Sequence, residues 1–293
     1  MHKLYSNKWI ISSLILPGII TFLVAVLAPI VVGFFYSLTD FNGIASTNFV
    51  GLKNYYTLFK DPVFWSSLRN TAVLVCTSLF IEHPLAMLIA YKLDKLPHKL
   101  EAILRWIYFV PNIISIVITA SLWKYVYNPN FGLLQKVLEL FGFHLKFNAL
   151  GSGTAIFALA FVLLQGGIGW AILFFYTGIK NIDPVLNEAA LIDGATSKQT
   201  FRYITFPLLR PVRKYCIVLA FIASLKQMEL VYLMTQGGPN NETHFFGSYL
   251  YDCAFNYNRY GYGNTIGIVL IVICLLCTVT INFLFKERQA RRK

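Results

Sequence analysis

The sequence predicts an all-α polytopic membrane protein with six transmembrane helices and a cytoplasmic helical hairpin between the fourth and fifth spans. Of its 293 residues 57% are hydrophobic and only 13% are charged, whereas an ordinary globular protein has about 25% charged residues. Several apolar runs reach the roughly 20 residues that a helix needs to cross a bilayer. Between two of these runs lies a polar stretch, NEAALIDGATSKQTFRYITFPLLRP (187–211), that carries signals for two short helices.

We expect the whole chain, residues 1–293, to form a single transmembrane domain. The six predicted spans cover about residues 9–38, 71–91, 103–125, 154–179, 212–234 and 264–285. The first apolar run is too long for a signal peptide and has no A-x-A-like cleavage site after it, so it is predicted to be a retained first span.

The distribution of basic residues orients these spans. The net charge is +12, and more than twice as many lysines and arginines lie in the termini and the second and fourth loops as in the other loops. Because basic residues concentrate on the cytoplasmic side, both termini are predicted to be cytoplasmic. No basic patch interleaved with aromatic residues indicates a nucleic-acid partner.

Two loops on the predicted outer side have helical patterns of their own. Residues 49–71 place aromatic residues and leucines at near-helical spacing, and Asp61-Pro62 is a typical helix start. Residues 127–147 place Leu133, Leu134 and Val137 on one face. Each segment is predicted to form a short interfacial helix.

Local signals define the hairpin around 183–211. Asp183-Pro184 starts its first helix, and Gly194 provides the left-handed residue that ends it. Thr196 followed by Gln199 is a capping-box signature for the second helix. That helix is predicted to stop near Phe206, because Pro207 disfavours a helical conformation in the residue before it.

Two interpretations of the hairpin remain open on these residues alone. An amphipathic connector could rest on the inner leaflet, although Ala189 and Ala190 would bury little apolar area in lipid. Alternatively, these small residues allow another protein surface to approach closely, with Glu188 accepting hydrogen bonds from it.

Ionisable residues inside the predicted spans mark a pathway or a partner, since an unpaired charge at a helix centre costs at least about 2.5 kcal/mol. Glu82 and His83 lie in the second span, and Lys226 and Glu229 lie in the fifth, three residues apart and so on one helix face. Lys226 and Glu229 could contact substrate, or they could pair with each other or with Glu82 and hold helices together.

Three further in-span residues, Gln165, Trp170 and Tyr232, carry amide, indole and phenol groups that could bond to, or stack on, a bound solute. Simple packing is the competing interpretation for the aromatic residues among them, because 16% of the chain is aromatic.

The stretches EAALIDGA and FRYITFPLLRP resemble the EAA loop of binding-protein-dependent ABC importer permeases. TQGGPNNET, at residues 235–243, resembles the Gly-Gly-Pro signature that follows the fifth span in the sugar-permease branch. The resemblance, to maltose-type and glycerol-phosphate-type permeases, covers nearly the whole chain.

The resemblance implies a role for each group of residues. Coupling to an ATPase subunit would fall to Glu188, Ala189, Ala190, Asp193 and Gly194. The substrate pathway would be lined by Glu82, Gln165, Trp170, Lys226, Glu229 and Tyr232. Contact with an extracytoplasmic solute-binding protein would fall to Gly237, Gly238 and Pro239.

The resemblance also implies partners. The chain has no G-x-x-x-x-G-K-[ST] phosphate loop, so ATP and Mg would be bound by two partner ATPase subunits and no cofactor by this chain. A second, related permease subunit would complete the pathway. His2, His98, His144 and His244 have no metal-ligand spacing, and no metal site is predicted.

The function expected from these features is ATP-driven uptake of a carbohydrate, an oligosaccharide in particular, by a transporter subunit that is not itself an enzyme. One alternative is a permease for a non-sugar solute such as a glycerol phosphodiester. The other is a membrane enzyme acting on lipid-linked sugars, which would need clustered catalytic residues at a membrane face.

Overall fold

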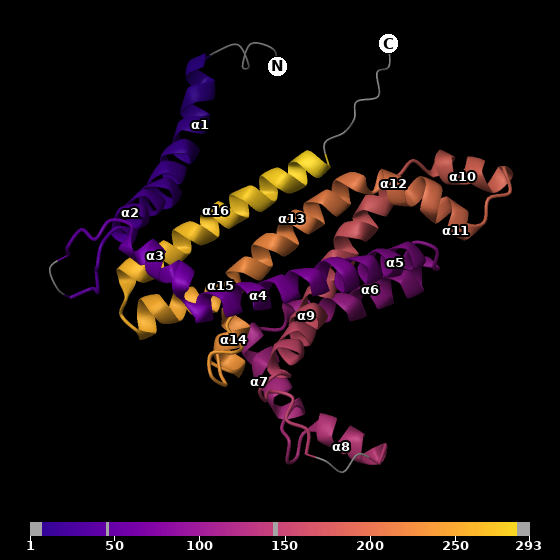
Figure 1. The fold of residues 1–293 in the computed structure, drawn as a ribbon. Helices are drawn as coiled ribbons and strands as arrows, with labels where there is room; N and C mark the ends of the chain where they lie inside the picture. The colour runs from indigo at the N-terminus through magenta and orange to yellow at the C-terminus, as the bar shows by residue number, and fades with distance from the viewer. Residues whose placement is uncertain (1–7, 45–46, 143–145, 286–293) are drawn as a thin grey trace. The chain divides into compact units, whose positions relative to one another are not determined.

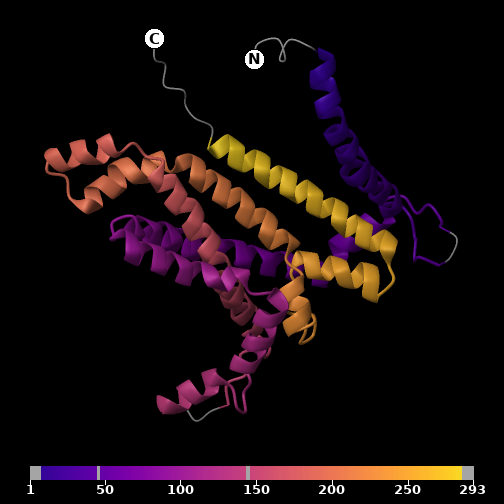
Figure 2. The ribbon, with the colours of Figure 1, turned by 180° about the vertical axis from the view of Figure 1, so that it is seen from behind.

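The computed structural model describes residues 8–44, 47–142 and 146–285. Within these ranges the chain is helical apart from loops and one isolated antiparallel bridge between Thr39 and Phe49 (Figures 1 and 2). The all-α prediction is therefore confirmed for that part of the chain. Both termini, whose cytoplasmic location was predicted, lie outside the described residues.

The chain divides into two compact units, Met1–Asp61 with Leu250–Val272 and Pro62–Tyr249 with Ile273–Lys293. The helices of the first unit are α1 (Lys8–Phe22), α2 (Ala28–Ser37), α3 (Lys53–Lys60) and the first part of α16 (Tyr260–Leu284). Asn54 of α3 donates hydrogen bonds to the carbonyl oxygens of Ser37 and Thr39 at 2.9 and 2.8 Å. Thr265 of α16 donates to the Ser37 carbonyl at 3.1 Å, so these three helices meet at the end of α2.

The loop after α2 is closed by a second set of hydrogen bonds. The Asp40 carboxylate accepts from the Asn48 backbone at 2.7 Å and from the Asn48 side chain at 3.1 Å. These bonds lower the pKa of Asp40 from its ordinary value.

The second unit contains the predicted hairpin and most of the candidate site residues. Its helices are α4 (Pro62–Thr77), α5 (His83–Leu93), α6 (His98–Ile113), α7 (Ile116–Val126), α8 (Leu133–Leu140), α9 (Ala155–Lys180), α10 (Pro184–Ile192), α11 (Ser197–Thr200), α12 (Phe206–Leu208), α13 (Arg210–Lys226) and α14 (Glu229–Met234), and α15 (Phe246–Tyr251) begins in it. A core between α5 and α9 packs the small residues Ala86 and Ala90 with the large residues Phe175 and Ile179. Small residues on one helix let the other approach closely, so α5 and α9 form the central pair of this unit.

Within the described residues, four helical stretches are long and apolar enough to cross a membrane: Ile11–Ser37, Pro62–Leu93, Ala155–Lys180 and Tyr260–Leu284. They overlap the predicted first, second, fourth and sixth spans. The second begins at Pro62 rather than near Thr71, because α4 starts immediately after α3 ends. The predicted outer helix over 49–71 is therefore α3 followed by the first turns of α4.

The predicted third and fifth spans are not continuous helices. The third consists of α6 and α7, which are bent by 94° at the break between them. The fifth is interrupted at Gln227–Met228, and α13 contains 17 residues and α14 only 6. Neither piece alone reaches the length of about 20 residues that spans a bilayer.

Three π-helical turns precede prolines inside long helices. The turns cover Leu23–Leu27, Ser78–Glu82 and Phe201–Thr205, and Pro29, Pro84 and Pro207 each follow two residues after the end of one. Proline lacks an N–H, and its ring clashes with the carbonyl four residues earlier. The wider π turn relieves this conflict, so the helices continue past the prolines.

One prediction about the hairpin is wrong, because a π turn also precedes Pro207. Its second leg does not stop at Phe206 but continues through Pro207 to Leu208 as α12. The N–H of Phe206 bonds to the carbonyl of Phe201, five residues earlier, and this π-type register accommodates the proline.

Candidate functional site

A cavity of about 790 Å³ lies within the second unit. Its walls come from α4, α5, the broken pair α6–α7, α9 and the interrupted pair α13–α14. The lining is mostly apolar, with a few polar groups from different helices, which is the usual composition of a small-molecule site.

Three of the six predicted pathway residues line this cavity, namely Glu82, Trp170 and Lys226. Gln165, Glu229 and Tyr232 are not among its lining residues.

The Glu82 carboxylate is held at the cavity wall by its own helix and by a glycine of α9. Ser78 donates a hydrogen bond to Glu82 Oε2 at 2.6 Å, and His83 Nδ1 lies 2.8 Å from the Ser78 carbonyl oxygen. Gly167 leaves room for the carboxylate, because a Cβ there would stand 2.5 Å from Glu82 Oε1. The Glu82 side chain therefore extends toward α9 into space that is free because residue 167 is glycine.

Of the two alternatives for Lys226, pairing with Glu229 or Glu82 is not seen as an ion pair among the described residues. Ion pairs in that part of the chain include Arg105 with Glu101 and Lys180 with Asp94. Lys226 and Glu229 do not share a helix face, because Lys226 ends α13 and Glu229 begins α14.

The interruption between Lys226 and Glu229 has a tertiary cause. Gly247 of α15 lies against the carbonyls of Lys226 and Gln227, where an added Cβ would stand 2.7 and 2.9 Å from their oxygens. The Gln227 N–H bonds back to Ser224 at 3.4 Å, which tightens the last turn of α13.

Sequence reasoning missed two cavity residues, Asn112 and Gln227. The side-chain nitrogen of each is buried and has no hydrogen-bond partner among the described residues. Asn112 lies next to the α6–α7 break and Gln227 at the α13–α14 break. The available signal was the presence of an amide in an apolar run, since a buried amide nitrogen needs an acceptor.

The hairpin has the predicted local structure. Asp183 accepts a hydrogen bond from the Val185 N–H at 3.0 Å at the start of α10, and the capping box between Thr196 and Gln199 is complete. Gly194 has φ +76°. The N–H groups of Gly194 and Ala195 bond to the carbonyls of Leu191 and Ala190 at 3.0 and 2.9 Å, which is a Schellman motif.

Four of the five predicted coupling residues, Glu188, Ala189, Asp193 and Gly194, are exposed. Ala190 differs: it is only 8% exposed, so its methyl group packs within the chain and is not presented to a partner. The first leg instead exposes large apolar side chains that the prediction did not include, Leu191 at 69% and Ile192 at 87%.

The loop that carries Gly237, Gly238 and Pro239 is fixed to α4. Asn70 donates hydrogen bonds to the carbonyls of Glu242 and His244 at 2.7 and 3.0 Å. Within the loop, Thr243 donates to the Gly238 carbonyl at 2.7 Å. Gly237 has φ +80° and packs against the His244 ring, so a larger residue would not fit there.

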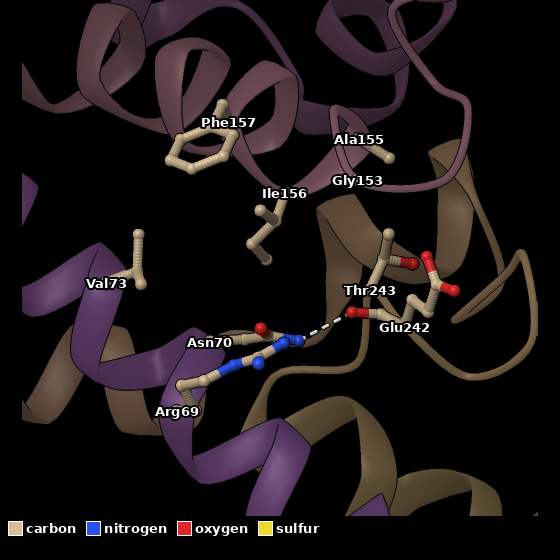
Figure 3. Close-up of a pocket in the computed structure, with 9 residues that line it drawn as sticks. All are labelled: Arg69, Asn70, Val73, Gly153, Ala155, Ile156, Phe157, Glu242 and Thr243. Carbon is tan, nitrogen blue, oxygen red and sulfur yellow. Dashed lines mark hydrogen bonds between the residues drawn. The ribbon is translucent and has the colours of Figure 1, made fainter.

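Beside this loop lies a pocket of about 200 Å³ (Figure 3). Arg69, Asn70 and Val73 of α4 form one side, Ile156 and Phe157 of α9 another, and Glu242 and Thr243 a third. Ser152 donates to the Glu242 carboxylate at 2.6 Å. The loop is therefore joined by hydrogen bonds to the middle of α4, through Asn70, and to the segment just before α9, through Ser152.

In the described part of the chain, no group of three or more His, Cys, Asp or Glu side chains is placed to hold a metal ion. His2 and His144 lie outside the described residues.

Residues 83–292 match the family described as binding-protein-dependent transport system inner membrane component. The multiple sugar-binding transport system permease protein MsmF of Streptococcus mutans is 33% identical over 281 residues, which cover 95% of this chain and 96% of MsmF. A probable ABC transporter permease protein of Pyrococcus horikoshii is 32% identical over 277 residues, which cover 93% of this chain and 92% of that protein.

Among solved structures, a bacterial ABC transporter involved in the import of the acidic polysaccharide alginate contains a similar chain. The TM-score is 0.83 and the identity 23%, with 96% of each chain covered. At this identity the likeness supports the shared fold.

These matches extend over nearly the whole chain, and the curated relatives are named as permeases rather than enzymes. They confirm the prediction of a transport subunit over that of a membrane enzyme. The chain belongs to the family of binding-protein-dependent transport system inner membrane components.

Proposed function

We propose that this chain is the transmembrane subunit of an ABC importer that takes up an oligosaccharide by ATP-driven alternating access. One observation carries the proposal. The same compact unit contains a cavity lined by a few polar groups and a capped hairpin whose first leg is exposed. A transporter needs both a place for the solute and a surface through which an ATPase acts on that place. The name of MsmF, a permease of a multiple sugar-binding system, supports a carbohydrate.

The proposed assembly contains two ATPase subunits, a second permease subunit and an extracytoplasmic solute-binding protein. The ATPases would bind ATP and Mg, and one of them would dock on the hairpin of this chain, where Glu188, Ala189, Asp193 and Gly194 are exposed. Ala190 would support the hairpin from inside. The loop at Gly237, Gly238 and Pro239 would meet the binding protein.

The proposed topology is a single permease domain over residues 1–293 with six spans and both termini in the cytoplasm of a bacterial or archaeal cell. In this topology the interrupted α13–α14 segment crosses the membrane as a broken span. Broken helices are tolerated at membrane depth where the freed backbone groups lie in protein or line a cavity, and this break borders the cavity described above.

In the cavity, Trp170 would stack on a sugar ring, and Glu82, Asn112 and Gln227 would bond sugar hydroxyls. The two amides suit this role because their buried nitrogens have no acceptor among the described residues. A hydroxyl-rich ligand would satisfy them, and a buried polar group without a partner costs about 1–3 kcal/mol.

A second candidate substrate is an acidic oligosaccharide. Lys226 lines the cavity and takes part in neither ion pair of the described residues. Its charge is therefore available for a carboxylate of the solute.

The test is to tag this chain in its native membrane, purify it under mild conditions and identify the proteins that accompany it. We expect an ATPase subunit and a second permease, and ATP hydrolysis that rises when a saccharide-loaded binding protein is added. The unloaded binding protein is the control. A chain that purifies alone, or with lipid-modifying enzymes, would contradict the importer assignment.

A further inference from the structure

The second leg of the hairpin is fastened to the end of α5 (Figure 1). The Tyr91 hydroxyl donates a hydrogen bond to the Ser197 carbonyl oxygen at 2.9 Å, and Lys95 Nζ donates to the Ser197 hydroxyl at 2.9 Å. Lys95 Nζ also lies 4.3 Å from the centroid of the Tyr91 ring. Two residues one helical turn apart thus hold the first residue of α11.

An aromatic contact and an ion pair reinforce this attachment. The rings of Tyr91 and Phe201 have centroids 4.8 Å apart. Lys180, the last residue of α9, is paired with Asp94 at 2.7 Å. The start of the hairpin is therefore attached to the end of α5 through α9, and the start of its second leg is attached there through Ser197.

The first leg, α10, carries the exposed Leu191 and Ile192. The Schellman turn and the capping box connect it to the attached second leg. A partner that displaces α10 consequently pulls on α5.

From its attachment to the hairpin, α5 leads directly to the cavity. His83, at the other end of α5, follows Glu82 without a break, and both line the cavity. The close packing of Ala86 and Ala90 with α9 leaves little room for α5 to slide independently. A displacement of α5 and α9 therefore moves Glu82 and Trp170.

We propose that Tyr91 and Lys95 are positioning residues that latch the hairpin to α5, so that movement of the hairpin is passed to the cavity wall. This proposal rests on the proposed importer function and identifies the contacts within this chain that would connect its two sites. Neither residue lines the cavity, and neither belongs to the exposed first leg.

The test compares transport with ATP hydrolysis in the complete complex reconstituted in vesicles. The variant is Tyr91→Phe with Lys95→Met, which removes both hydrogen bonds and keeps most of the side-chain volume. We expect solute transported per ATP hydrolysed to fall by about tenfold, the change that loss of two hydrogen bonds of ordinary strength can produce. Hydrolysis stimulated by the loaded binding protein should stay near the wild-type rate.

Lys92→Met is the matched control, because Lys92 lies next to Tyr91 in α5 and is exposed. This variant should leave the ratio of solute transported to ATP hydrolysed unchanged. Lys95→Arg, which keeps the charge and the reach, should restore coupling in the presence of Tyr91. An unchanged ratio in the double variant would overturn the latch.

If the double variant does not assemble, the single variants Lys95→Met and Lys95→Arg are compared instead. A lower ratio of solute transported to ATP hydrolysed in Lys95→Met alone would support the latch, and equal ratios would overturn it. A wild-type complex that hydrolyses ATP without transporting any solute would instead contradict the proposed function, so the two failures are distinguishable.

Discussion

Gly167 lies directly beside the Glu82 carboxylate, and a Cβ there would stand 2.5 Å from Oε1. Since the contacted atom is the end of a flexible side chain, Glu82 can move away at little cost to folding. The absence of a side chain at Gly167 therefore determines the position of the Glu82 carboxylate in the cavity. It has little effect on the packing of the helices.

Gly167→Ala is therefore expected to raise the KM for solute uptake several-fold while changing stability by less than about 1 kcal/mol. Gly166→Ala is the matched control: it also adds a methyl group to a cavity-lining glycine, but nothing lies within 4 Å of its Cβ. Uptake kinetics and thermal unfolding of the purified complex measure the two effects. Equal KM values for the Gly167→Ala protein and the wild type would show that the position of Glu82 is not used.

At position 194 glycine is required by the backbone conformation and not by crowding from neighbouring atoms. Nothing lies within 4 Å of a Cβ built there, but φ is +76°, which costs an L-residue roughly 1–2 kcal/mol. Gly194→Val is expected to abolish uptake while the protein still inserts, because a strained turn changes how α10 is presented. Gly194→Asn should retain most activity, since asparagine tolerates this conformation.

For both Gly194 variants, solute uptake by cells and the amount of the protein inserted in the membrane are measured. Full uptake by the Val variant would contradict a role for the turn in coupling.

At the scale of the element, the hairpin could be predicted from the sequence because its signals are local. Asp183, Gly194 and the Thr196–Gln199 box each act on residues within one turn. The interruption at Gln227–Met228 could not, since neither residue is glycine or proline and the break is stabilised by Gly247 from another helix. The prediction that Lys226 and Glu229 share a face failed for that reason.

The same contrast holds for the cavity. Glu82 and Lys226 were predictable because a charge in an apolar span is costly enough to be informative. Asn112 and Gln227 became candidates only when the structure placed them at helix breaks with buried, unpartnered nitrogens.

The loop after α14 is anchored to α4 by the side chain of Asn70. Asn70 → Ala would remove the donors to the Glu242 and His244 carbonyls, and leaving buried acceptors unsatisfied costs about 1–3 kcal/mol. We expect faster hydrogen exchange over residues 236–244 without unfolding of α4 or α9. The neighbouring Arg69→Gln is the control, since Arg69 is exposed and takes part in neither ion pair of the described residues; equal protection in both variants would argue against the anchor.

At the scale of the whole molecule, the number of membrane crossings depends on the interrupted segment over residues 210–234. If α13 and α14 together cross the bilayer, the hairpin and the Gly-Gly-Pro loop lie on opposite sides. If α13 enters and α14 returns, both lie on the same side and the six-span topology is wrong. The 17 residues of α13 lie at the short end of the roughly 17–25 that cross a bilayer, and α14 would lengthen the segment if it continues in the same direction.

Two single-cysteine variants decide between these topologies. Asp193 in the hairpin and Asn240 in the loop are both exposed, and Cys76, Cys216, Cys253, Cys274 and Cys277 would first be replaced. We expect a membrane-impermeant maleimide to label Asn240→Cys from outside intact cells, and Asp193→Cys only after the membrane is opened. Uptake by the cysteine-free parent controls for the replacements. Labelling of both sites under the same condition would mean that the segment is re-entrant, and the hairpin and the binding-protein loop could not then serve the two faces of one importer.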